Sequence, residues 1–454
     1  MTFPSTTRAR LGLALFFLAF AAGESRAVTL TVKNTDDSCN PWIMGGRCLR
    51  AAVGYANLFD DADRIEFDIP GEPNAYKRIL LQSTLSITQP LEIDGYTQPG
   101  ASPNTSTSGM NAEVRVIIDA LATHGPAFEV AATTDIRGLA IIKADGPGLY
   151  FRAWAPESRV RGNYIGSEVF GTMSGNRGGG IIAECDFCVI GGSDPADRNL
   201  ISANKAFGIR STGPRNVIIG NLIGTDRSGN PTLGNDVGVV VMADTNRVGD
   251  FGAALPNVIA GNRCDGVRVA PSSVNEVWIG SLMFANAADS PECRSIALAG
   301  NTYVNDTDDL DNGANGALNH PEIESVRESG KDLVVEGRIN SAAQTRYRVQ
   351  LFANFDASAC AEAGGPGEGQ AFLGDFEIDT PADSGVRAFT WSAPLAGFGV
   401  RAVAATASVG VPEVAAYSTS AFSPCALVVE GDDRIFGNGF DDAPAPVAGS
   451  LVLH

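Results

Sequence analysis

The feature that most constrains the fold is an internal repeat between Val160 and Arg268. Equivalent residues recur 58 positions apart across this stretch: Gly162 and Gly220, Asn163 and Asn221, Asn199 and Asn257, Asn204 and Asn262, Gly208 and Gly266, Arg210 and Arg268. A fixed offset over such a length is typical of a stacked array, in which each unit buries its apolar face against its neighbours.

The segments inside and around the repeat predict short strands. Apolar runs such as Leu85–Ile87, Val217–Ile219 and Val237–Val241 alternate with Gly, Pro and Asn turns. They are too short for helices and do not fit βαβ units. We therefore predict an all-β parallel β-helix over residues 28–300, with coils of about two dozen residues, so that 58 residues make two or three coils. One amphipathic helix is expected near residues 48–58, as a cap.

The repeated asparagines fit this architecture. Asn163, Asn204, Asn221 and Asn262 follow Gly or Ala at corners, where asparagine tolerates a left-handed backbone and bonds to neighbouring amides. We expect stacked copies to form amide ladders along the array. They are predicted to be scaffold and not catalytic groups.

The composition changes after the array. Residues 301–320 are rich in Asp, Asn and Gly and predict a linker or the edge of the array. Residues 321–428 contain strands with alternating faces and predict a small immunoglobulin-like β-sandwich. Residues 429–454 form an acidic and then Ala/Pro-rich tail.

The N-terminal residues and the charge indicate an exported protein. In residues 1–27, Arg8 and Arg10 precede an apolar run from Leu11 to Ala22, and a Ser-Arg-Ala site follows it, which is the pattern of a signal peptide. The net charge of −19 becomes −21 once the three arginines and one glutamate of this segment are removed. Such a charge disfavours nucleic acid and anionic lipid. No later segment predicts a membrane span, and we expect a monomer.

Eight cysteines in an exported chain predict disulfides. Eight cysteines permit about 105 connectivities. Local spacing favours four pairs: Cys39–Cys48, Cys185–Cys188, Cys264–Cys293 and Cys360–Cys425. No second CxxC and no nearby histidine supports a zinc site at Cys185 and Cys188, so a structural role is preferred there.

Several phrases resemble secreted bacterial β-helix proteins of the pectin-lyase-like superfamily. Residues 221–226 (NLIGTD), followed by Gly234-Asn235, resemble the recurrent phrase of that group, and residues 93–101 (IDGYTQPGA) resemble the end of its first coils. Residues 48–53 (CLRAAV) are similar to its N-terminal CSLREA motif, although the serine is missing and Ala51 replaces the usual glutamate. The sandwich and a short IF-DGFE-like motif in the tail also resemble segments of such exported proteins.

This resemblance implies a right-handed β-helix but no single activity. The superfamily holds lyases, hydrolases, adhesins and proteins of unknown role. Its hydrolases use aspartates with a histidine, whereas the three histidines here (His124, His320 and His454) lie outside the central coils. Histidine-assisted hydrolysis is therefore disfavoured.

The candidate catalytic residues are acids and arginines that recur across the repeat. Glu168 is equivalent to Asp226, Asp186 to Asp244, and Arg210 to Arg268. Equivalent residues two or three coils apart would be separated by roughly 10 to 14 Å, beyond the spacing of about 5 to 9.5 Å found in glycosidases. Turn architecture is thus the preferred interpretation of the acids, and a solvated strand edge that of the arginines.

Aromatic and acidic groups supply the remaining candidates. Four aromatic residues could stack on sugar rings or pack in the coils: Tyr150, Phe151, Trp154 and Trp278. Hard oxygens that could bind calcium gather in the 301–320 segment, for which a solvated acidic linker is the alternative: Asp306, Asp308, Asp309 and Asp311.

We expect a secreted or cell-surface β-helix that binds or adheres to glycans or other extracellular ligands. No other cofactor than calcium is indicated. A polysaccharide lyase or glycoside hydrolase acting in a groove of the coils is one alternative, and a structural component of the cell envelope is another.

Overall fold

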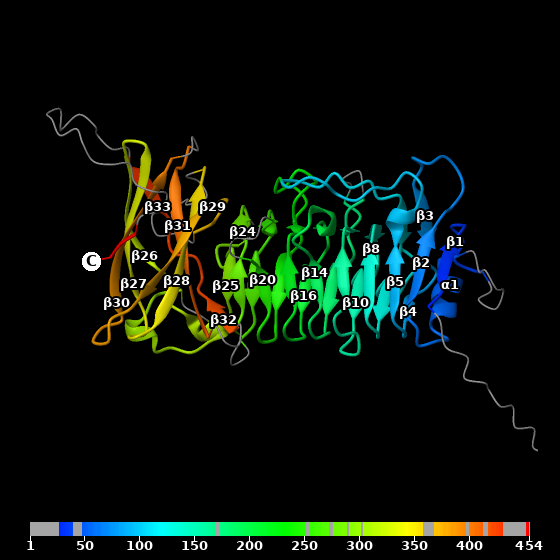
Figure 1. The fold of residues 1–454 in the computed structure, drawn as a ribbon, viewed down its shortest axis with the longest axis horizontal. Coiled ribbons are helices and arrows are strands. Elements are labelled where there is room, and N and C mark those ends of the chain that lie inside the picture. The colour runs from blue at the N-terminus through cyan, green and yellow to red at the C-terminus, as the bar shows by residue number, and fades with distance from the viewer. Residues whose placement is uncertain are drawn as a thin grey trace, which may run out of the picture.

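The protein consists of a parallel β-helix and a β-sandwich that packs against one of its ends (Figure 1). A computed structural model describes the following residues: 27–39, 48–168, 173–250, 255–271, 276–287, 290–300, 303–356, 367–395, 399–411, 416–429 and 451–453. The predicted signal peptide lies outside them, apart from Ala27. In the described part, no helix combines the length and the apolar character that a membrane span requires.

Three parallel sheets form the walls of the β-helix, and each coil visits sheets 1, 2 and 3 in turn. Sheet 1 contains β1 (Thr29–Val32), β2 (Asp63–Phe67), β5 (Leu91–Asp94), β8 (Thr134–Arg137), β11 (Arg159–Arg161), β14 (Val189–Gly191), β17 (Val217–Ile219), β20 (Arg247–Gly249) and β23 (Trp278–Gly280). Sheet 2 contains β3 (Lys77–Leu80), β6 (Val116–Asp119), β9 (Leu139–Ile142), β12 (Tyr164–Ile165), β15 (Leu200–Ile201), β18 (Leu222–Ile223), β21 (Val258–Ala260) and β24 (Leu282–Phe284). Sheet 3 contains β4 (Leu85–Ile87), β7 (Phe128–Val130), β10 (Leu149–Phe151), β13 (Ile181–Ala183), β16 (Phe207–Ser211), β19 (Val237–Val241), β22 (Val267–Val269) and β25 (Ile296–Leu298).

This arrangement confirms the predicted parallel β-helix and explains the repeat. Val189 and Arg247 begin β14 and β20, which are two strands apart in sheet 1, so the 58-residue offset spans two coils. The interior is closed by aliphatic stacks, because partners in register repeat the same residue type. The stack in sheet 2 consists of Ile79, Ile118, Ile141, Ile165, Ile201, Ile223, Ile259 and Met283. Each such side chain contributes about 1.5 to 3 kcal/mol through burial.

The predicted amide ladders are present, and they run in two separate columns. One column joins Asn163, Asn199, Asn221 and Asn257 through side-chain bonds of 2.9 to 3.2 Å. The other joins Asn176, Asn204, Asn235, Asn262 and Asn286 through bonds of 2.9 to 3.0 Å. All of these asparagines except Asn286 are at most 2% exposed. Their side-chain amides therefore supply the hydrogen bonds that the buried backbone groups at the corners cannot obtain from water.

A long excursion covers the outer face of sheet 2. Residues 98–115, which we call the strap, leave the coil after β5 and η1 (Gly95–Thr97) and form the cyan loop along the upper side of the β-helix in Figure 1. Strap residues Met110 and Ala112 pack with outward-facing apolar residues of sheet 2 such as Leu200 and Leu222. Tyr164 Oη donates to the Ala112 carbonyl at 3.1 Å. The strap thus leaves sheets 1 and 3 as the open faces.

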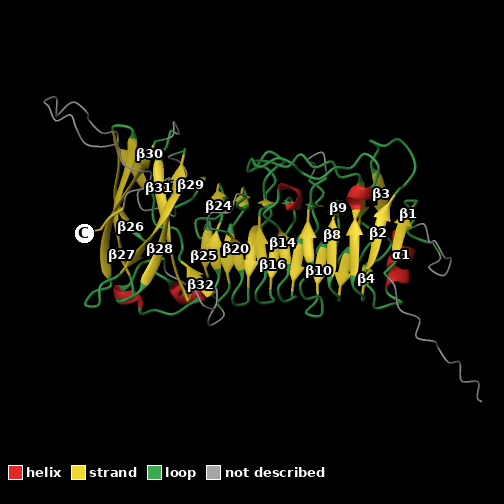
Figure 2. Cartoon of the chain, in the orientation of Figure 1, coloured by secondary structure: helices red, strands yellow, loops and turns green. Residues whose placement is uncertain are grey.

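The N-terminal end of the β-helix is covered by α1 (Leu49–Ala56), which lies within the predicted range (Figure 2). Leu49, Ala52 and Val53 point into the core of the first coil. The Cys39–Cys48 disulfide fixes the start of this helix, as its spacing predicts. The helix therefore closes the apolar interior at this end.

The C-terminal part folds into a β-sandwich. Its strands are β26 (Glu322–Ser329), β27 (Asp332–Asn340), β28 (Arg346–Asn354), β29 (Ala371–Asp379), β30 (Val386–Pro394), β31 (Ala402–Val411), β32 (Ala416–Thr419), β33 (Ala426–Val429) and β34 (Leu451–Leu453). One layer pairs β26, β27 and β30, and the other pairs β29, β28 and β31. Strand β33 pairs with both β26 and β31 and so joins the two layers at one edge. Their inner faces share one core, which includes Val335, Trp391 and Leu351. Because β34 pairs with β30, the end of the predicted tail belongs to this sheet.

The sandwich closes the C-terminal end of the β-helix. Met283 of β24 and Gly369 exchange two backbone hydrogen bonds of 2.8 and 2.7 Å. Phe352 and Phe422 of the sandwich join the aliphatic core of the coils. Glu368 accepts hydrogen bonds from the Asn286 amide at 3.3 Å and from two other groups of the last coil, so it terminates the second asparagine ladder.

The segment that the composition predicts as a linker is packed between the two parts. It contains η3 (Thr307–Asp309) and η4 (Ala314–Ala317). Asn315 is fully buried and donates to the carbonyls of Val277 in the β-helix and Thr419 in the sandwich, both at 2.8 Å. Residues 314–320 are mostly buried and the Asn315 side chain joins both parts, whereas residues 307–312 are mostly exposed.

Candidate functional site

The most distinctive open surface is the outer face of sheet 3 with the corner that leads into sheet 1. We call it the sheet 3 face. Strand alternation places Leu149 and Phe151 of β10 in the core and turns Tyr150 outward. Its outward residues are partly or largely exposed: Glu129, Tyr150, Arg152, Trp154, Ile182, Glu184, Phe187, Arg210 and Val240. This surface mixes aromatic, apolar and charged groups within neighbouring coils.

A charged network surrounds Tyr150. The Arg152 guanidinium lies 4.0 Å from the centre of the Tyr150 ring and donates to its hydroxyl at 2.6 Å. Arg152 also binds Glu129 at 2.7 Å, while Tyr150 donates to Glu184. Burial and this hydrogen bond to Glu184 raise the pKa of Tyr150. A phenol held protonated is a hydrogen-bond donor and is poorly suited to act as a general base.

The adjoining corner displays two aromatic rings. Trp154 is 78% exposed on an extended turn after β10, and Phe187 is 51% exposed on the turn of the next coil. Phe187 has a left-handed backbone (φ 59°) inside the loop closed by the buried Cys185–Cys188 disulfide. This disulfide is the pairing that the spacing of Cys185 and Cys188 favours. An aromatic side chain held outward in this way gains little from burial, so it is available to a ligand.

Arg215 supports the corner from the following coil. Its guanidinium lies 4.5 Å from the Phe187 ring centre, and its Nε donates to Asp186 Oδ1 at 3.0 Å. The hydrogen bond to Asp186 raises the pKa of Arg215. Asp186, a predicted catalytic candidate, is thus paired with a guanidinium. Its equivalent Asp244 contributes its backbone carbonyl to the Arg215 amide.

Arg210 lies on the same face and differs from the other arginines there. Its guanidinium lies 4.0 Å from the centre of the Phe207 ring, and its neighbours in register are Ile182 and Val240. Burial lowers its pKa, and its Nε has no hydrogen-bond partner among the described residues. Arg268, its equivalent two coils on, is instead paired with Asp265 at 2.5 Å.

The predicted acids of sheet 2 are not brought together. Glu168 follows β12 and contacts Arg78 at 3.1 Å and Lys143 at 3.9 Å. Asp226 follows β18, and its Oδ1 accepts the amides of Ser228 and Asn230 in a local turn. Although burial opposes it, hydrogen bonding to Asn230 and Ser228 lowers the pKa of Asp226. The six candidates therefore occupy sheet 2 loops, the sheet 3 corner and the sheet 3 face, and they form no common centre.

Three of the four predicted calcium ligands are close together. Carboxylate oxygens of Asp306, Asp309 and Asp311 lie within 4.8 Å of one another, whereas Asp308 does not join the group. Burial raises the pKa of Asp309 and, together with the charge of Asp306, that of Asp311. Asp309 already accepts hydrogen bonds from the Asn319 amide and the Ser341 hydroxyl. Calcium binding stays a prediction, which thermal unfolding with and without calcium would test.

Two further disulfide predictions concern the C-terminal half. Cys264 pairs with Cys293, as expected from their spacing, and links the last two coils. Cys425 is disulfide-bonded, and Cys360, its predicted partner, lies outside the described residues. The first and the last coils of the β-helix are thus both covalently constrained.

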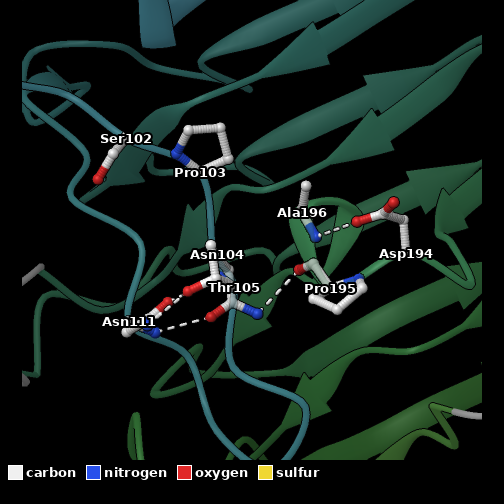
Figure 3. A pocket seen from close by; sticks show the side chains of 8 residues that line it. All are labelled: Ser102, Pro103, Asn104, Thr105, Asn111, Asp194, Pro195 and Ala196. Carbon is white, nitrogen blue, oxygen red and sulfur yellow. Dashed lines mark hydrogen bonds between the residues drawn. The ribbon is translucent and has the colours of Figure 1, made fainter.

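A pocket of about 500 Å³ lies elsewhere, at the corner between sheets 1 and 2 (Figure 3). The strap forms one wall and η2 (Pro195–Asp197) the other. Sequence reasoning missed this pocket, because its walls are 80 residues or more apart in the chain.

Of the four aromatic residues that the sequence offers as sugar-stacking candidates, Tyr150 and Trp154 lie on the sheet 3 face. Phe151 is buried in the core, and the Arg247 guanidinium lies 4.8 Å from the centre of the Trp278 ring.

Comparisons with protein-family models and with curated proteins give no match for this chain. The functional argument therefore depends on the surfaces described above.

Proposed function

We propose that the protein is an exported glycan-binding β-helix and that the sheet 3 face is its binding surface. The likeness to secreted pectin-lyase-like proteins belongs to this proposal, as does a location outside the cell or on its surface. The observation that carries it is the display of Trp154 and Phe187 to solvent from adjacent coils of a rigid array.

The chemistry of the face suits sugar rings. Aromatic rings offer apolar planes for the C–H faces of sugars, while the carboxylates and guanidinium groups beside them bond to hydroxyl groups. Glu184 and Arg152 lie next to Tyr150, and Asp186 and Arg215 lie next to Phe187, so two of the three aromatic residues of the face have a polar pair beside them. Because the backbone is fixed by ladders and aliphatic stacks, little ordering entropy is lost on binding.

A glycan array tests the proposal with a matched pair of variants. Trp154→Ala removes the exposed ring, whereas Leu121→Ala removes a side chain that is 67% exposed on a different corner, between sheets 2 and 3. We expect at least a tenfold weaker binding to the recognised glycans for Trp154→Ala, about 1.4 kcal/mol or more. Leu121→Ala should bind like the wild type. No binding to any glycan, or equal loss in both variants, would contradict the proposal.

Turnover separates binding from catalysis at the same face. The purified protein is incubated with a panel of polysaccharides, with and without calcium. New reducing ends without absorbance from unsaturated products would assign hydrolysis, whereas new reducing ends accompanied by that absorbance would assign lyase activity. We expect neither, because the acids of this face are paired with Arg152 and Arg215.

A further inference from the structure

The pocket between the strap and η2 has walls that are tied together across the chain. Asn104 of the strap is 2% exposed, and its Nδ2 donates to the Pro195 carbonyl of η2 at 2.8 Å. The same nitrogen donates to the Ser106 carbonyl at 2.9 Å, and Oδ1 accepts the Asn111 amide at 2.8 Å. One buried amide therefore fixes both walls, and the pocket exists without a ligand.

The strap is also held at points beyond the pocket. Arg198, directly after η2, donates to the Gly109 carbonyl of the strap at 3.0 Å and to the Gly220 carbonyl at 3.0 Å. Arg227 donates to the Met110 carbonyl at 3.2 Å. The pocket wall is consequently anchored to two consecutive coils, which limits its movement.

Several polar groups that line the pocket keep hydrogen-bonding capacity beyond the bonds that they make within the fold. Asp194 Oδ1 accepts the Ala196 amide at 2.8 Å, whereas Oδ2 has no hydrogen-bond partner among the described residues (Figure 3). Thr105 Oγ1 accepts from Asn111 Nδ2 at 3.0 Å, so its own proton stays available for donation. The exposed hydroxyl of Ser102 adds a further donor and acceptor.

Apart from the hydroxyl and amide groups, the lining of the pocket consists of apolar residues and one carboxylate. Pro103 and Pro195 present ring carbons to the pocket, and Asp194 is the only lining residue with a formal charge. A carboxylate accepts hydrogen bonds from neutral hydroxyl groups but repels anions. The space between the two walls is about 500 Å³ and is largely open to solvent, so a bound molecule would stay partly exposed.

We infer that this pocket binds a neutral sugar or polyol of one or two rings, with Asp194 accepting its hydroxyl protons and Thr105 and Ser102 completing the contacts. The site is separate from the sheet 3 face, because it lies at the corner between sheets 1 and 2. The inference therefore goes beyond the proposed function and stands or falls independently of it.

Saturation-transfer NMR with individual neutral sugars tests the pocket, with glucose, galactose, mannose and xylose as probes and glucuronic acid as the anionic comparison. We expect millimolar binding of at least one neutral sugar and markedly weaker binding of the uronate. Asp194→Asn keeps a side-chain oxygen for the Ala196 amide but replaces the free acceptor, so binding should weaken about tenfold. Ser102→Phe should fill the pocket and abolish the signal.

Two control variants locate the bound sugar. Ser108→Phe makes the same change at an exposed strap position outside the pocket and should leave binding intact. Trp154→Ala should also leave it intact; if Trp154→Ala abolishes binding, the sugar occupies the sheet 3 face instead. Absence of binding by all four neutral sugars, equal binding of glucuronic acid, or retention of binding in Ser102→Phe would each overturn the inference.

Discussion

At the scale of single residues, the buried asparagines carry most of the corner hydrogen bonding. Asn221 is fully buried; its Nδ2 donates to the Ile190 carbonyl at 2.8 Å, and its Oδ1 accepts from Asn199 at 2.9 Å. Replacing it leaves buried groups in two coils unpaired. The corners thus depend on side chains as much as on the backbone.

We predict that Asn221→Ala lowers the free energy of unfolding by about 2 to 4 kcal/mol, because each unpaired buried polar group costs about 1 to 3 kcal/mol. Urea unfolding followed by circular dichroism measures this loss. Asn74→Ala, at an exposed position, is the control and should change stability by less than about 0.5 kcal/mol. A similar small change in Asn221→Ala would show that the ladder is dispensable.

Sequence reasoning predicted these asparagines but not their grouping. It identified Asn163 and Asn221 as one repeat pair and Asn204 and Asn262 as another, and these pairs lie in the two different ladders. Asn176 was not singled out and Asn235 was named only within the phrase that ends in Gly234-Asn235, because these two residues lie 59 and not 58 positions apart. Side-chain direction at the corner, which requires the backbone, decides which ladder an asparagine joins.

At the scale of elements, the strap depends on Arg198. Its guanidinium is buried and donates to the carbonyls of Gly109 and Gly220. Burial lowers the pKa of Arg198. Arg198 thus holds the strap, which precedes it by about 90 residues in the chain, against the coil that contains Arg198.

We predict that Arg198→Leu increases amide hydrogen exchange in residues 104–112 by tenfold or more, since the strap loses its bond at Gly109. Arg177→Leu is the control, because Arg177 is largely exposed and pairs only with exposed Asp145. Unchanged exchange in the Arg198 variant would indicate that apolar packing alone holds the strap.

The joint between β-helix and sandwich should respond to pH through Glu368. Burial raises the pKa of Glu368, against the hydrogen bonds it accepts from Ala285, Ser295 and Asn286. The folded protein therefore binds this proton more tightly than the unfolded chain. This tighter proton binding stabilises the folded protein in full below the ordinary glutamate pKa. The stabilisation is lost as the pH rises through the raised pKa of Glu368.

We predict that the unfolding free energy of the wild type minus that of Glu368→Gln decreases as the pH is raised from about 4 to about 7, because glutamine does not titrate. Urea unfolding at several pH values measures it. Glu292→Gln, an exposed change on the last coil, should show no comparable trend. A difference that grows with pH would mean that the ionised carboxylate, not the protonated one, stabilises the joint.

The strands of the coils could be predicted from short apolar runs, whereas the strap and the joint could not. The strap has no regular period, and its position depends on Arg198 and Arg227, which are distant in sequence. The role of Glu368 depends on which end of the ladder faces the sandwich, and no local pattern encodes that.

At the scale of the whole molecule, the two parts share a hydrogen-bonded and apolar junction. The second asparagine ladder continues into Glu368, and Phe352 and Phe422 extend the aliphatic core. The composition predicted two parts and a linker, but it did not predict that the linker residues around Asn315 would be buried. A glycan bound on the sheet 3 face would thus be held at a fixed position relative to the sandwich.

The emission of Trp154 during titration with a glycan selected from the array tests the central claim most directly. Wild type and Trp154→Phe are compared, so that a change missing from the variant belongs to Trp154, which is 78% exposed. We predict a shift of its emission to shorter wavelength and protection from acrylamide quenching, since a sugar ring would cover the indole. Saturable glycan binding that leaves Trp154 emission and quenching unchanged would contradict the account.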